Sequence, residues 1–359
     1  MNLLNAYTTQ YVFSLIYFYL LISCILDILP LKRSMPQFFT FYLPCVILIT
    51  LTGFRVFGFS RDDHAYLEIY NDIDSFKFIE LDRDIGYIFF LKIFNNFFEY
   101  PDIFLYISLF FILIKFFILK KITINRNLSL VLLVYTSIYW QIHDVTQFRV
   151  SAAITFFLIF YFLTLKNYDV LRFLPLLVSI SLHLQSIFYV FLLLKRTVIS
   201  KIYLRRIIAI SIFLGIGLNI YNINNSIITV IRPTLELFWG FSRLDTYLSM
   251  MNQGDFDHFR NYPNMLLAFL IALYWLTGED NLQMSRGWAI ISNSILLTII
   301  LSFVFFGVTD VQVRLYEQLL FVIVLIAGQI KKVSCKLVLI MLSTLNFYKF
   351  NISWNIFNF

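Results

Sequence analysis

The chain has 359 residues, of which 60% are apolar and only 14% are charged, with a formal net charge of +7 and a mean hydropathy of +0.80. Soluble domains are roughly half apolar and about a quarter charged, so an aqueous fold cannot bury this much apolar surface. The composition therefore predicts an all-α polytopic membrane protein and excludes a soluble domain carrying one membrane anchor.

Apolar runs along the chain predict about ten to twelve membrane-spanning helices. The run 86–98 is too short to cross a membrane alone. No connection is long enough for a second domain, so residues 1–359 are expected to form one transmembrane domain with two long outer loops, 54–84 and 225–262. The candidate spans are 8–29, 36–53, 102–119, 127–142, 150–165, 207–224, 263–277, 288–306, 315–330 and 337–352.

The segment 171–194 decides the predicted topology. The turns on either side of it, 166–172 and 195–206, are both basic, and the positive-inside rule places both in the cytoplasm. A single span cannot satisfy this rule, whereas two half-helices, 171–182 and 184–194, can enter and leave on one side, with His183 near the tip. Such a break is tolerated where it is buried in protein or lines a wet cavity, so we predict a re-entrant helix pair.

With this topology, basic residues concentrate in cytoplasmic turns and acidic residues in outer loops. The positive net charge is then a signature of membrane topology, and no nucleic-acid partner is expected. The outer bases are mostly arginine, whose planar fork suits phosphate and carboxylate, so an anionic ligand is expected on that side. These outer arginines are Arg55, Arg61, Arg83, Arg149, Arg232, Arg243, Arg260 and Arg314.

The outer loop 54–84 is the longest polar stretch. Helical spacing places Asp62, Tyr66 and Tyr70 on one face and predicts that Asp63 points elsewhere. Two interpretations stand side by side. The loop is either a solvated segment whose acids balance its arginines, or a platform that binds sugars through carboxylates and tyrosine rings.

Three further residues are candidates for chemistry. Arg149 ends the short outer turn 143–149 and is followed by an apolar run, where a charged side chain either has a functional partner or reaches out to lipid headgroups. The same alternatives hold for Arg314. His183 has apolar neighbours, so it is either satisfied by a backbone carbonyl or lies at the tip of the re-entrant pair.

Metal and nucleotide chemistry have little support in the sequence. The four histidines are scattered without ligand-like spacing, and Asp-x-Asp triplets such as Asp72 with Asp74 arise easily in acidic loops, so no metal or other cofactor is expected. The chain has no P-loop, GxGxxG or GxSxG motif, which argues against ATP-driven transport and serine hydrolysis.

The order of features in residues 50–320 resembles the Wzy-type polymerases of O-antigen (lipopolysaccharide) and capsule synthesis, in particular the EpsG-like branch. That branch has an arginine, a glycine and an aspartate, followed four residues later by a tyrosine, in its first large outer loop. The matching residues here are Arg55, Gly58, Asp62 and Tyr66.

Later motifs of the branch occur in the same order. They are an acidic residue before Gly-Tyr, an arginine opening an alanine-containing helix, a histidine with a serine three residues on, and a late outer arginine. Aspartate stands where glutamate is usual in the first of these, and Thr146 and Val150 replace the common Asn and Gln around the arginine. The matching residues are Asp84, Gly86 and Tyr87, then Arg149, Ala152 and Ala153, then His183 and Ser186, and finally Arg314.

The resemblance implies a metal-independent membrane glycosyltransferase of GT-C-like architecture, acting at the outer face of a bacterial inner membrane. It would move a growing glycan from undecaprenyl pyrophosphate onto another lipid-linked repeat unit, with membrane lipids and a chain-length regulator as further partners. Arginines can stabilise the leaving pyrophosphate, and the acceptor hydroxyl needs a general base. The implied roles are pyrophosphate binding for Arg149, Arg314 and Arg55, base catalysis for Asp62 or His183, and sugar binding for Tyr66, Tyr70, Asp84 and Tyr87.

Two functions from other classes remain open. A lipid-linked oligosaccharide flippase would need an inward-facing cavity and no catalytic base. A membrane sugar acyltransferase would take a thioester donor from the cytoplasm and use histidine. The predicted cytoplasmic turns are short and hold no histidine, which disfavours the acyltransferase. The predicted outer placement of nearly all acids and of every histidine disfavours both alternatives.

Overall fold

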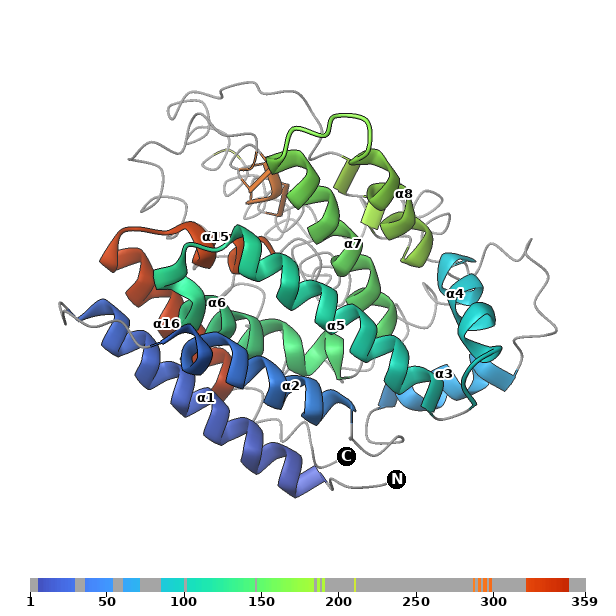
Figure 1. Cartoon of the computed structure of the whole chain (residues 1–359), viewed down its shortest axis with the longest axis horizontal. Coiled ribbons are helices and arrows are strands. Elements are labelled where there is room, and N and C mark those ends of the chain that lie inside the picture. The colour runs from blue at the N-terminus through green and yellow to red at the C-terminus, as the bar shows by residue number, and fades with distance from the viewer. Residues whose placement is uncertain are drawn as a thin grey trace, which may run out of the picture. The chain divides into compact units, whose positions relative to one another are not determined.

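The computed structural model describes residues 6–29, 36–53, 61–71, 85–99, 102–145, 147–183 and 321–348, together with scattered positions between 186 and 298. The chain divides into two compact units, residues 1–183 with 323–359, and residues 184–322. The described helices belong almost entirely to the first unit (Figure 1).

The described residues form helices and no strand. They confirm helices in the predicted spans 8–29, 36–53, 102–119, 127–142, 150–165 and 337–352 and in the later part of 315–330, and the short run 86–98 also contains a helix. The predicted spans 207–224, 263–277 and 288–306 lie outside the described residues or are described only at isolated positions. The helices are α1 Ala6–Ile28, η1 Phe38–Tyr42, α2 Leu43–Gly53, α3 Arg61–Asn71, α4 Ile85–Asn95, α5 Asp102–Ile122, η2 Asn125–Asn127, α6 Leu128–Tyr135, η3 Thr136–Asp144, α7 Phe148–Leu165, α8 Phe173–Leu182, α15 Val322–Gln329 and α16 Val333–Tyr348.

Three described segments, Thr9–Ile28, Asp102–Ile122 and Phe148–Leu165, are long and apolar enough to cross a membrane. Shorter apolar helices, among them Phe38–Gly53 and Val333–Tyr348, pack beside them. The described part of the chain is thus all-helical, and the chain is a polytopic membrane protein. The total of ten to twelve spans and the GT-C-like architecture remain predictions, since much of residues 184–320 is not described.

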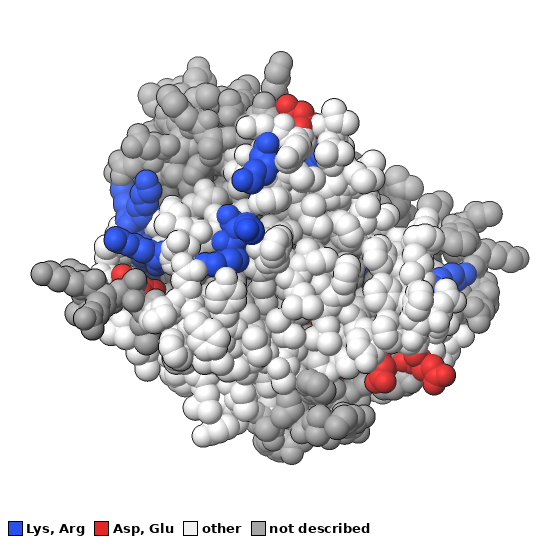
Figure 2. Space-filling model, viewed as in Figure 1, with Lys and Arg blue, Asp and Glu red and all other residues white. Residues whose placement is uncertain are grey.

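The surface of α5 shows why this bundle belongs in lipid. Its exposed face carries Phe110, Leu113 and Phe117 at helical spacing, while its opposite face buries Ile107 and Phe111. A surface helix of a soluble protein would carry polar side chains on its outer face. Figure 2 shows the result as a broad uncharged belt across the described helices.

Charged residues lie toward the two ends of the helices. α5 begins with Asp102 and ends with Lys120 and Lys121, and in Figure 2 blue atoms gather toward its C-terminal end while a red group lies near its start. We call the first of these the basic end, formed by the turns around Lys121, Lys166 and Lys332. The turn after α5 is bonded to the end of α15, because the backbone N–H of Ile124 donates to the carbonyl of Gly328 at 3.0 Å.

One helix changes its winding half-way across the bundle. α6 continues directly into η3, a nine-residue π-helix, and π-helical stretches are uncommon and frequent at functional sites. Within η3, Trp140 is fully buried and stacks on Phe13 of α1 with ring centroids 5.0 Å apart. Its indole N–H donates to the hydroxyl of Thr52 in α2 at 2.9 Å. The π-helix is therefore fixed against two other helices.

α7 and α8 form an antiparallel hairpin. Asn167, at the turn, has a φ of 62°, a left-handed conformation that Asn tolerates and that commonly ends helices. α8 ends at Leu182, and His183 is extended, with φ −155° and ψ 111°. The ten residues of α8 span only about 15 Å, half the hydrocarbon thickness. This matches the first half of the predicted re-entrant pair, whereas 184–194 are described only at isolated positions, so the pair itself stays a prediction.

Candidate functional site

Arg149 and Tyr66 form the centre of the candidate site. Arg149 is the second residue of α7, where backbone N–H groups have no partner within the helix. Its N–H donates to the Tyr66 hydroxyl at 3.4 Å, and its guanidinium carbon lies 5.8 Å from the centroid of the Tyr66 ring. A residue of α3 thus contacts both the backbone and the side chain of Arg149. We call this pair the Tyr66–Arg149 site.

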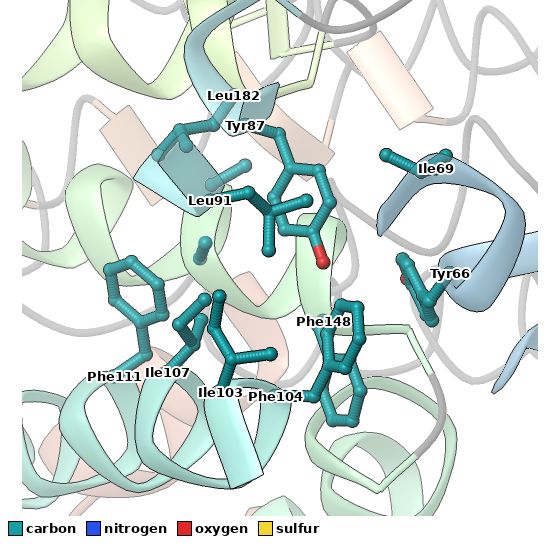
Figure 3. Packing of buried hydrophobic residues seen from close by; sticks show 12 residues of the cluster. Tyr66, Ile69, Tyr87, Leu91, Ile103, Phe104, Ile107, Phe111, Phe148 and Leu182 are labelled. Carbon is teal, nitrogen blue, oxygen red and sulfur yellow. The ribbon is translucent and has the colours of Figure 1, made fainter. Parts of the chain in front are cut away.

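Tyr66 is held in place by other aromatic rings (Figure 3). Its ring centroid lies 5.8 Å from that of Tyr87, 5.7 Å from Phe104 and 5.1 Å from Phe148. Phe104 and Phe148 are themselves stacked, with an interplanar angle of 16°. These four residues, the aromatic cluster, come from α3, α4, α5 and α7. Because the cluster is buried, the position of the Tyr66 hydroxyl beneath Arg149 is fixed by four helices.

The inward face of α3 differs from the sequence prediction at one position. Tyr66 is buried, and Tyr70 is half-buried and donates its hydroxyl to Asn95 Oδ1 at 2.8 Å, so these two tyrosines share a face as predicted. Asp63, expected to point elsewhere, is fully buried. Residues three and four positions apart share a helix face, so Asp63 fits that face as well as Asp62 does. The side chain of Asp62 lies outside the described residues.

Gly86 allows α4 to pack closely against α8. A Cβ atom at Gly86 would lie 2.3 Å from the Ser181 hydroxyl oxygen and 2.7 Å from its backbone carbon, closer than any side chain permits. The Gly-Tyr pair thus has a structural reason: glycine brings α4 against α8, and the next residue, Tyr87, joins the aromatic cluster with 1% of its surface exposed.

His183 lies at the same end of the α7–α8 hairpin as Arg149. Ser179 of α8 donates its hydroxyl to the carbonyl of Ala153 in α7 at 2.8 Å. Arg149 precedes Ala153 by four residues, His183 follows Ser179 by four, and the helices are antiparallel. Each residue therefore lies about 6 Å along its helix axis from that contact. Both side chains are half-buried. Arg55, Asp84 and Arg314 lie outside the described residues.

A comparison with protein families shows which family this chain belongs to. A model of the EpsG family matches residues 38–358, which is nearly the whole chain and includes every candidate residue. The chain belongs to the EpsG family. This confirms the resemblance seen in the motifs, and it makes the chain a polysaccharide-polymerase-like membrane protein with glycosyltransferase-like chemistry. Neither a curated protein nor a solved structure matches the chain.

A second polar cluster in this EpsG-family protein was missed by sequence reasoning. Lys115 of α5 forms an ion pair with Asp144, the last residue of η3, and both side chains are only 1% exposed. Lys115 Nζ also donates to the Ser151 hydroxyl at 2.6 Å, and that hydroxyl donates to Asp144 Oδ1 at 2.6 Å. The Tyr135 hydroxyl donates to the other carboxylate oxygen. We call these four residues the Lys115–Asp144 network.

A signal for the network was present in the sequence. Lys115 lies inside the apolar run 102–119, and an ionisable residue within a membrane span is expected to face the protein interior and to have a partner. Asp144 is the first acidic residue after Lys115 along the chain, but only the three-dimensional path of η3 shows that the two side chains meet.

The described residues contain no group of three or more His, Cys, Asp or Glu side chains arranged to hold a metal ion. Cys24, Cys45 and Cys335 are buried free thiols. At the candidate site itself, positive charge comes from the Arg149 guanidinium and from the N-terminal end of α7.

Proposed function

We propose that this EpsG-family protein polymerises lipid-linked oligosaccharide repeat units. The growing glycan would leave undecaprenyl pyrophosphate and join the non-reducing end of a second lipid-linked unit. The observation that carries the proposal is the placement of Arg149, half-buried over the Tyr66 ring in the first turn of an apolar helix long enough to cross a membrane.

The leaving group explains why that placement suits this chemistry. Pyrophosphate gains negative charge as the glycosidic bond breaks, and preorganised positive groups stabilise that charge best. The N-terminus of α7 supplies the positive end of a helix dipole, which favours bound phosphate groups. Arg149 adds a guanidinium that can donate two parallel hydrogen bonds to phosphate oxygens. Arg55 and Arg314 are proposed as further pyrophosphate ligands, and the reaction is proposed to need no metal.

The acceptor sugar hydroxyl must lose a proton as it attacks. Asp62 and His183 are the two proposed bases. Asp62 precedes Tyr66 by one turn of α3, and His183 lies at the end of α8 level with Arg149. Replacing each by Asn and measuring single-turnover transfer separates them, because only the true base should lose the chemical step. Tyr70 and Asp84 are proposed to bind sugar units beside them. Tyr66 and Tyr87, expected from the sequence to bind sugar as well, are 3% and 1% exposed, so they are too enclosed for that role and instead pack beneath Arg149.

The side of the membrane is inferred from the charge distribution. The basic end lies at the opposite end of α7 from Arg149, and basic turns normally face the cytoplasm, so the proposed site faces the periplasm or the cell exterior. Cysteines placed at exposed Lys166 and exposed Glu68 test this with a membrane-impermeant reagent applied to whole spheroplasts. Labelling should occur at position 68 only, and labelling at 166 alone would reverse the orientation.

The decisive experiment incubates the purified protein in proteoliposomes with an undecaprenyl-pyrophosphate-linked repeat unit. A ladder of products differing by one repeat unit supports the proposal. Movement of the substrate between leaflets without elongation would instead indicate a flippase, and transfer of an acyl group from a thioester would indicate an acyltransferase.

A further inference from the structure

We propose that Lys115 is a positioning residue for Arg149. It binds the side chains at both ends of the segment 144–151, which contains Arg149. The catalytic meaning of this inference rests on the proposed function, whereas its structural part does not. Lys115 itself is fully enclosed by protein, so it has no route to a substrate and must act through other residues.

The geometry of the Lys115–Asp144 network supports this role. The turn between η3 and α7 begins after Asp144 and leads into the first turn of α7, where Ser151 lies. The single ammonium group of Lys115 binds the side chains on both sides of this turn, Asp144 before it and Ser151 after it. The direct bond from Ser151 to Asp144 closes a triangle. Arg149 lies two residues before Ser151, inside the segment that the triangle encloses.

Hydrogen bonds within the turn transmit this constraint. The backbone N–H of Gln147 donates to the carbonyl of His143 at 3.1 Å, and that of Val145 donates to Trp140 at 3.1 Å. The His143 ring nitrogen Nδ1 and Gln147 Oε1 are also hydrogen-bonded at 2.9 Å. The segment that precedes Arg149 is thus fixed from inside the bundle by Lys115, while Tyr66 contacts Arg149 from α3. A shift of the turn would break one set of contacts or the other.

Stability alone does not explain a buried ion pair in this place. Moving two charges out of water is costly, and apolar residues of similar volume often give equal or better stability. A lysine, however, offers three donors on a compact charge and can bind two acceptors on different helices at once. Lys115 joins α5 to η3 and to α7, and its two partners, Asp144 and Ser151, lie on either side of Arg149 along the chain.

The test uses the full-length protein in nanodiscs with both charges removed together. Lys115→Met/Asp144→Asn avoids an unpaired buried carboxylate, and Asn can still bond Tyr135 and Ser151. Lys121→Met, at the exposed end of the same helix, is the matched control. Hydrogen–deuterium exchange of the peptide spanning 143–151 is measured first, and then the kinetics of polymerisation.

We expect the double variant to unfold at nearly the wild-type temperature, yet to exchange the amides of the turn at least tenfold faster and to lose at least tenfold in kcat with little change in KM. The control should match wild type in all of these. Wild-type exchange in the turn, or a wild-type kcat, would overturn the proposal. If the double variant does not fold, the same two measurements are made on Ser151→Ala, which removes only the bonds that join Lys115 and Asp144 to α7. We expect faster amide exchange in the turn and a lower kcat, both by smaller factors than in the double variant, and wild-type values of either would overturn the proposal.

These readouts separate the two proposals. If the wild-type protein makes no ladder, the proposed function fails, but the exchange measurement still reports whether Lys115 holds the turn. If the ladder forms and exchange in the double variant is unchanged, only the positioning role fails.

Discussion

Lys115 and Arg149 are two basic residues within apolar helices of the same bundle, and their surroundings differ completely. Lys115 is fully enclosed, with a carboxylate and a hydroxyl bonded to its ammonium group. Arg149 is half-buried, and its guanidinium lies over an aromatic ring. A cation whose hydrogen bonds are met by protein is fixed in place. A cation that lies over a ring and is still partly exposed is within reach of an incoming anion.

The role of a charged residue in an apolar helix therefore depends on how far the side chain is buried. Both residues satisfy the same sequence criterion, an ionisable group in or beside a membrane span. Their burial separates a structural role from a ligand-binding role.

The largest effect is expected when one charge of the enclosed Lys115–Asp144 pair is removed. Lys115→Met leaves Asp144 buried without its counter-ion, so we expect the free energy of unfolding to fall by about 3–5 kcal/mol. Arg149→Met should cost less, about 1 kcal/mol, because its side chain is already partly exposed. Thermal unfolding in detergent measures both. Equal losses of unfolding free energy would show that Lys115 and Arg149 contribute to stability in the same way.

Arg149→Lys tests the accessible side of the comparison. If the guanidinium binds pyrophosphate with two parallel hydrogen bonds, lysine retains the charge but loses the fork. We then expect the lysine variant to be nearly as damaged as Arg149→Ala, with a loss of about 3 kcal/mol, roughly a hundredfold in rate, at normal expression. Arg126→Lys, exposed in η2, is the control. Near-normal chain synthesis in Arg149→Lys would show that Arg149 only reaches toward lipid headgroups.

Gly86→Ala probes the packing beneath the Tyr66–Arg149 site. The added Cβ would meet backbone of α8, so we expect a loss of about 1–3 kcal/mol and a displaced Tyr87. Gly53→Ala in α2 is matched to it, because there the nearest atoms belong to the Leu109 side chain, at 3.0 Å, which can move. Its loss in thermal unfolding should be smaller. An equal cost at both glycines would argue against a tight α4–α8 contact.

The smallest expected effect is that of metal removal. If arginine and the α7 dipole stabilise the leaving group, EDTA should leave the rate of polymerisation unchanged, as measured by the length and intensity of the product ladder. A full loss of synthesis that magnesium or manganese restores would contradict this. The Asp72/Asp74 pair would then become the leading site, and Arg149 would at most assist it.

Much of the helical architecture can be predicted from the sequence. The apolar runs at 102–119 and 150–165 predict α5 and α7 closely, because a membrane span requires a long uninterrupted run of apolar residues. The charge of the turns that flank 171–194 is enough to predict the break at His183. Helical spacing predicts the face that Tyr66 and Tyr70 share.

The remaining features depend on tertiary packing, which local patterns do not encode. The rotation of α3 that buries Asp63 is set by the aromatic cluster, and spacing permits either aspartate to point inward. The pairing of Lys115 with Asp144 depends on the π-helical winding of η3, since a change in winding alters which side chains face α5. No composition rule predicts where a helix changes from α to π.

The contact between α1 and α16 has a consequence for how the chain is made. Tyr17 stacks on Phe347 with ring centroids 3.9 Å apart and donates its hydroxyl to Thr344 at 3.0 Å. At elongation rates of about 5–20 residues per second, roughly 15–65 s separate the synthesis of the two partners. α1 can stack on Trp140 early, but its second face has to remain against lipid until α16 is inserted. The bundle is therefore completed only after α16 has been synthesised, and a chain truncated before residue 333 would lack the partner of the Tyr17 hydroxyl.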